Sequence, residues 1–244
     1  MHMAGRCAVL FDVDGTLVDT NWLHTVAWWR AFRALGRDVP MHVLHHNVGK
    51  GADQFIPAVL GEVDPELRKA LDAAHADFYA PDLYGLIPLP GAGELLRAVA
   101  SAGVLVVLAS SCSSTEAHHL RGALAADDVV SAMTDAADVA ATKPHPDVIA
   151  AALGKVDVPA DRAVFVGDSI WDVQACEQAG LACIGLECGG TAGRELLAAG
   201  AVAVHRDPAH LLAGLHSSPI GRLIRSACSD ATPGPAPATD QVRT

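Results

Sequence analysis

FDVDGTLVDT, residues 11–20, begins where a short apolar run near the N-terminus ends. The run, Cys7–Phe11, predicts a buried strand of a parallel sheet. Residues two apart in a strand point to the same side, so Asp12 and Asp14 should project together from the strand end. Carboxylates held this close repel one another unless a cation or a proton lies between them. The stretch therefore indicates a functional site.

Composition predicts a globular protein with a large core. The 244 residues are 51% hydrophobic and 18% charged, with a mean hydropathy of +0.28. A net charge of −11 argues against nucleic acid or an anionic membrane as a partner, although a small anionic substrate could bind beside a metal. No apolar run reaches the roughly 20 residues that span a bilayer, and no signal peptide precedes the first strand. The six cysteines form no CxxC pair, so we expect reduced thiols in a cytoplasmic protein.

Two kinds of pattern divide the chain. Residues 20–87 show helical periodicity, whereas residues 88–218 alternate between helices and apolar strands. The alternation predicts an α/β fold with a parallel sheet covered on both faces, and the helices form an insertion behind the first strand. Residues 1–19 and 88–218 are therefore expected to form the core. We expect disorder over 219–244, which ends in a Pro/Ala-rich tail.

Polar side chains follow the predicted strands at the edge where ligands bind in open parallel sheets. Ser110 and Ser111 follow the strand at 104–109, and Asp168 follows the strand at 163–166. Lys143 stands before a proline, which favours an extended backbone. Asp12 and Asp168 could share a hard cation such as Mg²⁺ through oxygen ligands. Asp12 could then attack phosphorus and Asp14 could move the proton; a plain polar loop is the alternative.

Several of these residues also fit a purely structural role. Ser113 and Glu116 fit a helix capping box, whereas Ser110 better fits a phosphate contact. Lys143 could balance the acids and hold a phosphoryl group, or could be an ordinary surface lysine. Asp172 could support a metal or could cap a helix through the stretch 169–172.

Four segments together resemble the four motifs of the haloacid dehalogenase superfamily, in the same order. They are FDVDGTLVDT at 11–20, Ser110 at the end of VVLAS, Lys143-Pro144, and GDSIWD at 167–172. The resemblance covers roughly residues 6 to 216. The helical block at 20–87 looks like the cap of the subfamily that contains phosphoglycolate phosphatases and β-phosphoglucomutases.

The resemblance implies a Rossmann-like core closed by a mobile helical cap. It implies that Asp12 is the nucleophile and Asp14 the general acid/base. Mg²⁺ would be bound by Asp12, Asp168 and the backbone carbonyl of Asp14, supported by Asp172. Dehalogenases lack the second acid of the first motif, so the presence of Asp14 favours phosphoryl transfer from an oxygen ester. Thr16, Ser110, Ser111 and Lys143 would hold the phosphoryl group.

The helical block offers two further candidates for contact with the substrate. VGKGAD at 48–53 looks like the VGNGAD cap loop of phosphoglycolate phosphatases, with Lys50 in place of asparagine. Lys50 would suit an anionic substrate, or the segment could be a plain turn between helices. His24 lies where β-phosphoglucomutases carry a linker histidine. Four aromatic residues at helical spacing are expected to pack in the core of the block: Trp22, Trp28, Trp29 and Phe32.

The sequence and the resemblance thus predict a Mg²⁺-dependent phosphatase that hydrolyses a small phosphomonoester metabolite, similar to phosphoglycolate or a sugar phosphate, through an aspartyl-phosphate. A phosphomutase is the rival of the same class. A non-catalytic protein that binds phosphorylated ligands is the rival of a different class. We expect a monomer or a homodimer.

Overall fold

A six-stranded parallel sheet forms the centre of the computed structural model, which describes residues 6–230. The strand order is β3-β2-β1-β4-β5-β6, so the first strand lies between β2 and β4 in the middle of the sheet. This order and the parallel pairing confirm the predicted α/β fold. The strands are β1 (Ala8–Phe11), β2 (Leu105–Ala109), β3 (Val130–Thr134), β4 (Ala163–Gly167), β5 (Ala182–Leu186) and β6 (Ala203–His205).

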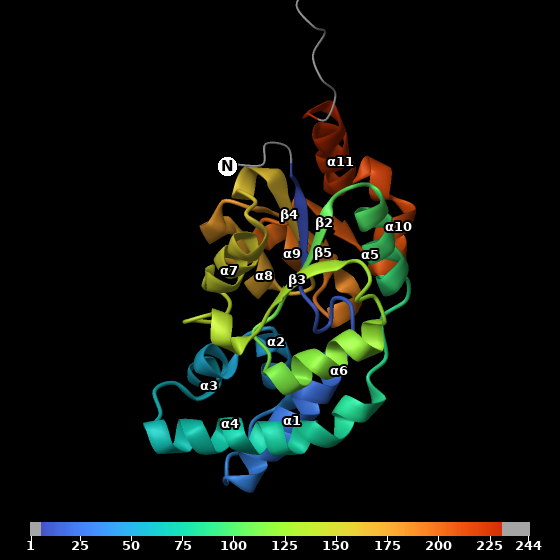
Figure 1. The fold of residues 1–244 in the computed structure, drawn as a ribbon. Coiled ribbons are helices and arrows are strands. Elements are labelled where there is room, and N and C mark those ends of the chain that lie inside the picture. Colours follow the sequence, from blue (N-terminus) through green and yellow to red (C-terminus); the bar gives the residue numbers. More distant parts are fainter. Residues whose placement is uncertain (1–5, 231–244) are drawn as a thin grey trace, which may run out of the picture.

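Helices cover both faces of the sheet and complete three layers (Figure 1). Val9 and Phe11 of β1 pack on one side with α5 (Ala92–Ser101), α10 (Pro208–Ala213) and α11 (Pro219–Asp230). Ala8 and Leu10 point to the other side, towards α7 (Asp147–Val156), α8 (Ile170–Ala179) and α9 (Gly193–Ala199). This alternation buries β1 on both faces, which explains why its sequence is continuously apolar.

The helical block lies beyond the carboxyl end of the sheet (Figure 1). It has a hydrophobic core of its own, in which Trp28, Phe32 and Phe55 are buried and in ring contact. The helix α6 (Ser114–Leu124), which follows β2, lies beside the block in the same view. The helices of the block are α1 (Asn21–Ala34), α2 (Met41–Asn47), α3 (Ala52–Leu60) and α4 (Pro65–Tyr79).

Two expectations about packing and order are wrong. Trp22 is 56% exposed, because it lies about 240° around α1 from the buried Trp28 at 100° per residue. The expected disorder from residue 219 is also wrong up to Asp230, where the chain forms α11. Ile220 and Leu223 bury against the core at helical spacing, a signal that the adjoining proline and serines obscured. Residues 231–244, with the Pro/Ala-rich tail, lie outside the described residues.

β3 pairs only with β2 in the described sheet. It lies at the edge of the sheet and is only half-buried, so Ser131 and Thr134 interrupt the apolar pattern that marks the central strands. Across residues 6–230, no helix is long and apolar enough to cross a membrane. The cysteines whose side chains are described form no disulfide with one another.

Candidate active site

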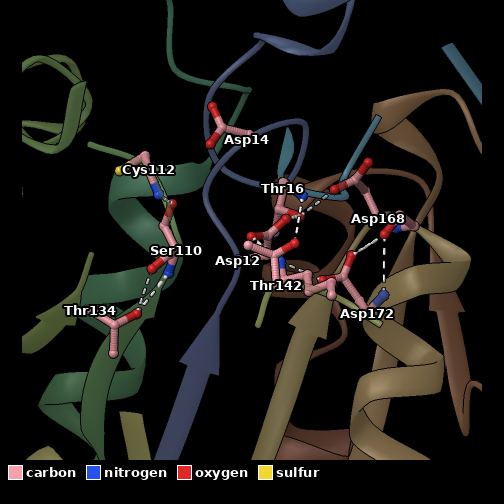
Figure 2. A network of polar contacts seen from close by, with 12 residues as sticks. Asp12, Asp14, Thr16, Ser110, Cys112, Thr134, Thr142, Asp168 and Asp172 are labelled. Carbon is pink, nitrogen blue, oxygen red and sulfur yellow. Dashed lines mark hydrogen bonds and ion pairs between the residues drawn. The ribbon is translucent and has the colours of Figure 1, made fainter. Parts of the chain in front are cut away.

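Three buried carboxylates meet at the carboxyl ends of the two central strands. Asp12 follows β1, Asp168 follows β4, and Asp172 lies in the first turn of α8. One oxygen from each lies within 4.8 Å of the others, and none of the three residues is more than 4% exposed. Figure 2 shows the three acids gathered with Thr16 on one side of β1. The predicted convergence of Asp12 and Asp168 is therefore found, and Asp172 joins them.

Lys143 lies between two of these acids. Its ammonium nitrogen is 2.5 Å from Asp12 Oδ1 and 2.7 Å from Asp172 Oδ1. The residue is 4% exposed, which excludes the alternative of an ordinary surface lysine. Burial alone would lower the pKa of Lys143, but the charges of Asp12 and Asp172 raise it above its usual value. Lys143 therefore stays charged.

The charge of the group is not balanced by its own side chains. Three carboxylates against one lysine leave a formal charge of −2 when all are ionised. Burial, followed by the charge of Asp172, raises the pKa of Asp168 to about 7. Burial also raises the pKa of Asp12, with further contributions from Asp172 and Asp168 that Lys143 partly offsets. A divalent cation held by oxygen ligands fits this excess of negative charge.

Neutral side chains position Asp168. Thr16 Oγ1 donates to Asp168 Oδ1 at 2.8 Å, and Asn21 Nδ2 donates to Asp168 Oδ2 at 2.8 Å and to the Gly189 carbonyl at 2.9 Å. A Cβ at position 189 would lie 1.7 Å from Asp168 Oδ2, so only glycine allows this approach. Thr16 was predicted to bind phosphate; in this structure its hydroxyl contacts the acids. The sequence does not single out Asn21, because nothing distinguishes it from any polar residue that begins a helix.

Asp172 caps its helix and also pairs with Lys143. Ser169 Oγ accepts from the Asp172 amide at 3.2 Å, and Asp172 Oδ2 accepts from the Ser169 amide at 3.0 Å, which forms the expected capping box. The other carboxylate oxygen, Oδ1, is the one that pairs with Lys143. The two roles use different oxygens and do not compete.

Ser110 lies on the other side of β1 from the acids (Figure 2). Ser110 is 4% exposed, its amide donates to Thr134 Oγ1 at 3.0 Å, and its hydroxyl accepts from the Cys112 amide at 3.1 Å (Figure 2). Ser111 is half-buried. Ser113 caps α6 with Glu116, as expected. The turn after β2 is therefore fixed by its own hydrogen bonds, with the Ser110 hydroxyl near the sheet edge.

The Asp14 side chain lies apart from the three acids (Figure 2). Asp14 Oδ1 accepts from Thr20 Oγ1 at 2.7 Å and is 3.5 Å from His24 Nε2. Burial would raise the pKa of Asp14, but the hydrogen bonds and charge of His24 lower it overall. The two acids of the first motif thus have separate surroundings, and His24 belongs to that of Asp14.

Lys50 lies away from the acids. Its ammonium nitrogen is 3.6 Å from the centre of the Trp171 ring and donates to Asn47 Oδ1 at 2.8 Å. The next residues join the helical block to the segment that carries Lys143, because the Gly51 amide donates to Thr142 Oγ1 at 3.0 Å. The Thr142 amide also donates to Asp53 Oδ2 at 3.1 Å. In this structure Lys50 fastens the block to the core.

Comparison with known proteins agrees with this geometry. The family model described as haloacid dehalogenase-like hydrolase matches residues 8–180. A phosphoglycolate phosphatase from Rhodospirillum rubrum is 33% identical over 84% of this chain and 88% of its own. The crystal structure of a hydrolase from Pseudomonas syringae has a TM-score of 0.82 at 31% identity, over 87% of this chain and 99% of the other.

A third similar protein has been crystallised with a ligand. CbbY from Rhodobacter sphaeroides, in complex with xylulose-(1,5)bisphosphate, has a TM-score of 0.70 at 29% identity, over 85% of this chain and 98% of the other. The chain belongs to the haloacid dehalogenase-like hydrolases. The resemblance of its four short motifs to that superfamily is thereby confirmed.

Proposed function

We propose that the protein is a Mg²⁺-dependent phosphatase that hydrolyses a small phosphomonoester through an aspartyl-phosphate. The observation that carries the proposal is the group formed by Asp12, Asp168 and Asp172 around the buried Lys143. Such a group is costly to bury, and its excess of negative charge suits a cation and a transferring phosphoryl group. The phosphatase names of similar proteins support the same activity.

Asp12 is the nucleophile in this proposal. A carboxylate oxygen of Asp12 attacks phosphorus while the bond between phosphorus and the ester oxygen breaks. Lys143, at 2.5 Å, favours the ionised form of Asp12 against the effect of burial, and it lies where it can also contact the phosphoryl oxygens. Asp14 passes a proton, which the neighbouring His24 can supply, to the leaving oxygen and then takes one from the water that attacks the aspartyl-phosphate. Phosphate leaves, and both acids return to their starting states.

Asp12, Asp168 and the backbone carbonyl of Asp14 would hold Mg²⁺, with Asp172 beside them. When bound, the ion supplies a positive charge that orients the phosphoryl group and offsets its negative charge. Thr16 and Asn21 orient Asp168, and the Lys143 ammonium donates a hydrogen bond to Asp12 Oδ1. Ser110 is the proposed phosphate contact on the opposite side, with Ser111 next to it.

The block α1–α4 is proposed to act as the cap, residues 20–87, over a core of residues 1–19 and 88–218. Its separate hydrophobic core supports movement as a unit. Its contacts with the core around Thr142 and Trp171 are polar or cation–π and could be released without exposing a large apolar surface. Closure of such a block would exclude water from the acids.

Phosphate release from a panel of phosphomonoesters with Mg²⁺ tests the proposal. Asp12→Asn should lower kcat by about 10³-fold or more. The exposed Asp19 lies in the same loop, so Asp19→Asn is the matched control and should keep its activity. Equal activity of Asp12→Asn and the parent protein would refute the mechanism. Conversion of a sugar phosphate into its isomer without net phosphate release would identify a phosphomutase.

A further inference from the structure

A second buried polar group surrounds Asp14. His24 Nε2, from α1, lies 3.5 Å from Asp14 Oδ1 and 3.6 Å from Glu116 Oε1 of α6. The side chains of these three residues are less than 20% exposed. The sequence marks Glu116 only as part of a capping box. The structure shows that its other carboxylate oxygen reaches the histidine beside Asp14, at the place where the helical block meets the core.

Tyr79 closes this group from the helical block. It is the last residue of α4 and is 3% exposed, and its ring stacks on the His24 ring with 4.0 Å between centroids. The hydroxyl has no hydrogen-bond partner among the residues that the structure describes. Burial, with the charges of Asp14 and Glu116, raises the pKa of Tyr79, so the hydroxyl keeps its proton. A buried hydroxyl without a partner is unfavourable, which indicates a place for a hydrogen-bonding ligand.

The charges around Asp14 limit which ligand fits. Among the described residues, no lysine or arginine forms an ion pair with Asp14 or Glu116. Burial and the charge of Asp14 raise the pKa of Glu116, and His24 is the cation that opposes them. Lys143 is occupied by Asp12 and Asp172, and Lys50 lies on Trp171. A carboxylate or a second phosphate placed here would meet two acids and a single histidine.

We propose that Asp14, His24, Glu116 and Tyr79 form the subsite for the leaving group, and that it selects uncharged, hydroxyl-bearing leaving groups over carboxylated or phosphorylated ones. The inference rests on the proposed phosphatase function, in which Asp14 protonates the leaving oxygen. The Tyr79 hydroxyl offers a hydrogen bond to a hydroxyl group of the ligand, and Glu116 both accepts from such groups and repels anions. Glu116 and Tyr79 are thus the residues that determine specificity.

Two phosphomonoesters of similar size test this selection. Glycerol 1-phosphate has an uncharged, hydroxylated leaving group, whereas phosphoglycolate carries a carboxylate. With the full chain and Mg²⁺, kcat/KM for glycerol 1-phosphate should exceed that for phosphoglycolate by about tenfold or more, since unfavourable placement of a charge costs several times more than one hydrogen bond. Equal values, or a preference for phosphoglycolate, would overturn the proposal.

Variants assign the preference to particular side chains. Glu116→Gln keeps the capping geometry and removes the charge. The ratio of kcat/KM for glycerol 1-phosphate to kcat/KM for phosphoglycolate should therefore fall about fivefold to tenfold. Glu94→Gln, an exposed glutamate in the first turn of α5, is the matched control and should leave the ratio unchanged. Tyr79→Phe keeps the stacking on His24. It should lower kcat/KM for glycerol 1-phosphate about tenfold relative to p-nitrophenyl phosphate, whose leaving group has no second hydroxyl.

Tyr84 is the other tyrosine of the chain and is 85% exposed, so Tyr84→Phe should not change this second ratio. Absence of phosphate release from all three compounds would refute the phosphatase function itself. In that case calorimetric binding of glycerol 1-phosphate and phosphoglycolate to Asp12→Asn still tests the subsite. Tighter binding of phosphoglycolate, with no change in Glu116→Gln, would refute the subsite alone.

Discussion

Asn21 shows how a single neutral side chain can fix the position of a charged one. Both of its amide protons are used, one on Asp168 and one on the Gly189 carbonyl, and the residue is 6% exposed. Gly15 has a φ of 72°, and a Cβ there would lie 2.2 Å from Asn21 Nδ2. Two glycines therefore make room for the contact between Asn21 and Asp168, which joins the first turn of α1 to the core.

Asn21→Ala should weaken Mg²⁺ binding by about 10- to 100-fold, which is typical of losing a hydrogen-bond partner of a metal ligand. Titration calorimetry with MgCl₂ measures this change without reference to catalysis. Asn47, a buried asparagine at the end of α2 whose amide donates to the Val43 carbonyl, provides the control: Asn47→Ala should bind Mg²⁺ as the parent does. Unchanged affinity in Asn21→Ala would show that Thr16 alone positions Asp168.

At the scale of elements, the helical block packs around stacked aromatic and histidine rings. His75 of α4 stacks on Trp28 of α1 with 4.1 Å between centroids, and its Nε2 lies 3.2 Å from His24 Nδ1. Burial, with the charge of His24, lowers the pKa of His75 well below its usual value. For His24, burial is outweighed by Asp14 and Glu116, so its pKa is raised. His75 is thus kept neutral, whereas the neighbouring His24 favours its protonated form.

The pH dependence of stability follows from the sign of the His75 shift. Above the unfolded pKa of about 6.5, His75 is neutral in both states and carries no penalty. Below pH 6.5, His75 binds a proton in the unfolded chain but not in the folded block, so the free energy of unfolding falls by up to about 1.4 kcal/mol per pH unit. His24 acts in the opposite direction, since its raised pKa adds stability as the pH falls towards 6.5.

His75→Phe should preserve the stacking on Trp28 and remove the loss of stability below pH 6.5. Urea denaturation at pH 7.5 and 5.5 measures the difference, which should shrink by about 1 kcal/mol relative to the parent protein. His118→Gln, at an exposed position on α6, is the control and should keep the parental difference. The same loss of stability in His75→Phe would mean that another group takes up the proton.

The sequence predicted the structure best where an apolar strand pattern is followed directly by acidic or hydroxyl side chains. The strands predicted at 104–109 and 163–166 are found, each within one residue, as β2 and β4, and the acids after β1 and β4 meet because parallel strands end at one edge of the sheet. Contacts between the helical block and the core could not be predicted from the sequence, because they depend on how two separately packed units meet. Tyr79, 65 residues after Asp14, could not be placed beside it by any local pattern, and Lys50, predicted to contact the substrate, lies on Trp171 in the structure.

At the scale of the whole molecule, Thr142 is the residue through which the helical block contacts the segment that carries Lys143. Its hydroxyl accepts from the Gly51 amide and donates to Asp53, and its amide donates to the same carboxylate. Burial would raise the pKa of Asp53, but the hydrogen bonds from Thr142 lower it overall, so Asp53 is ionised at neutral pH. The position of the block and the position of Lys143 are thereby linked through one residue.

Thr142→Val keeps the shape of the side chain and removes the hydroxyl, so the block should open more often. Losing a net hydrogen bond of about 1 kcal/mol or more predicts that the Gly51 amide exchanges its hydrogen about five- to tenfold faster. Hydrogen exchange resolved at Gly51 measures this. Thr115→Val, at an exposed position on α6, should exchange as the parent does. Unchanged exchange at Gly51 in Thr142→Val would mean that Lys50 on Trp171 holds the block without Thr142. Substrate that favours the closed block should slow hydrogen exchange at the Gly51 amide further in the parent protein. The slowing should be smaller in Thr142→Val, because part of the binding energy is then needed to replace the lost contact.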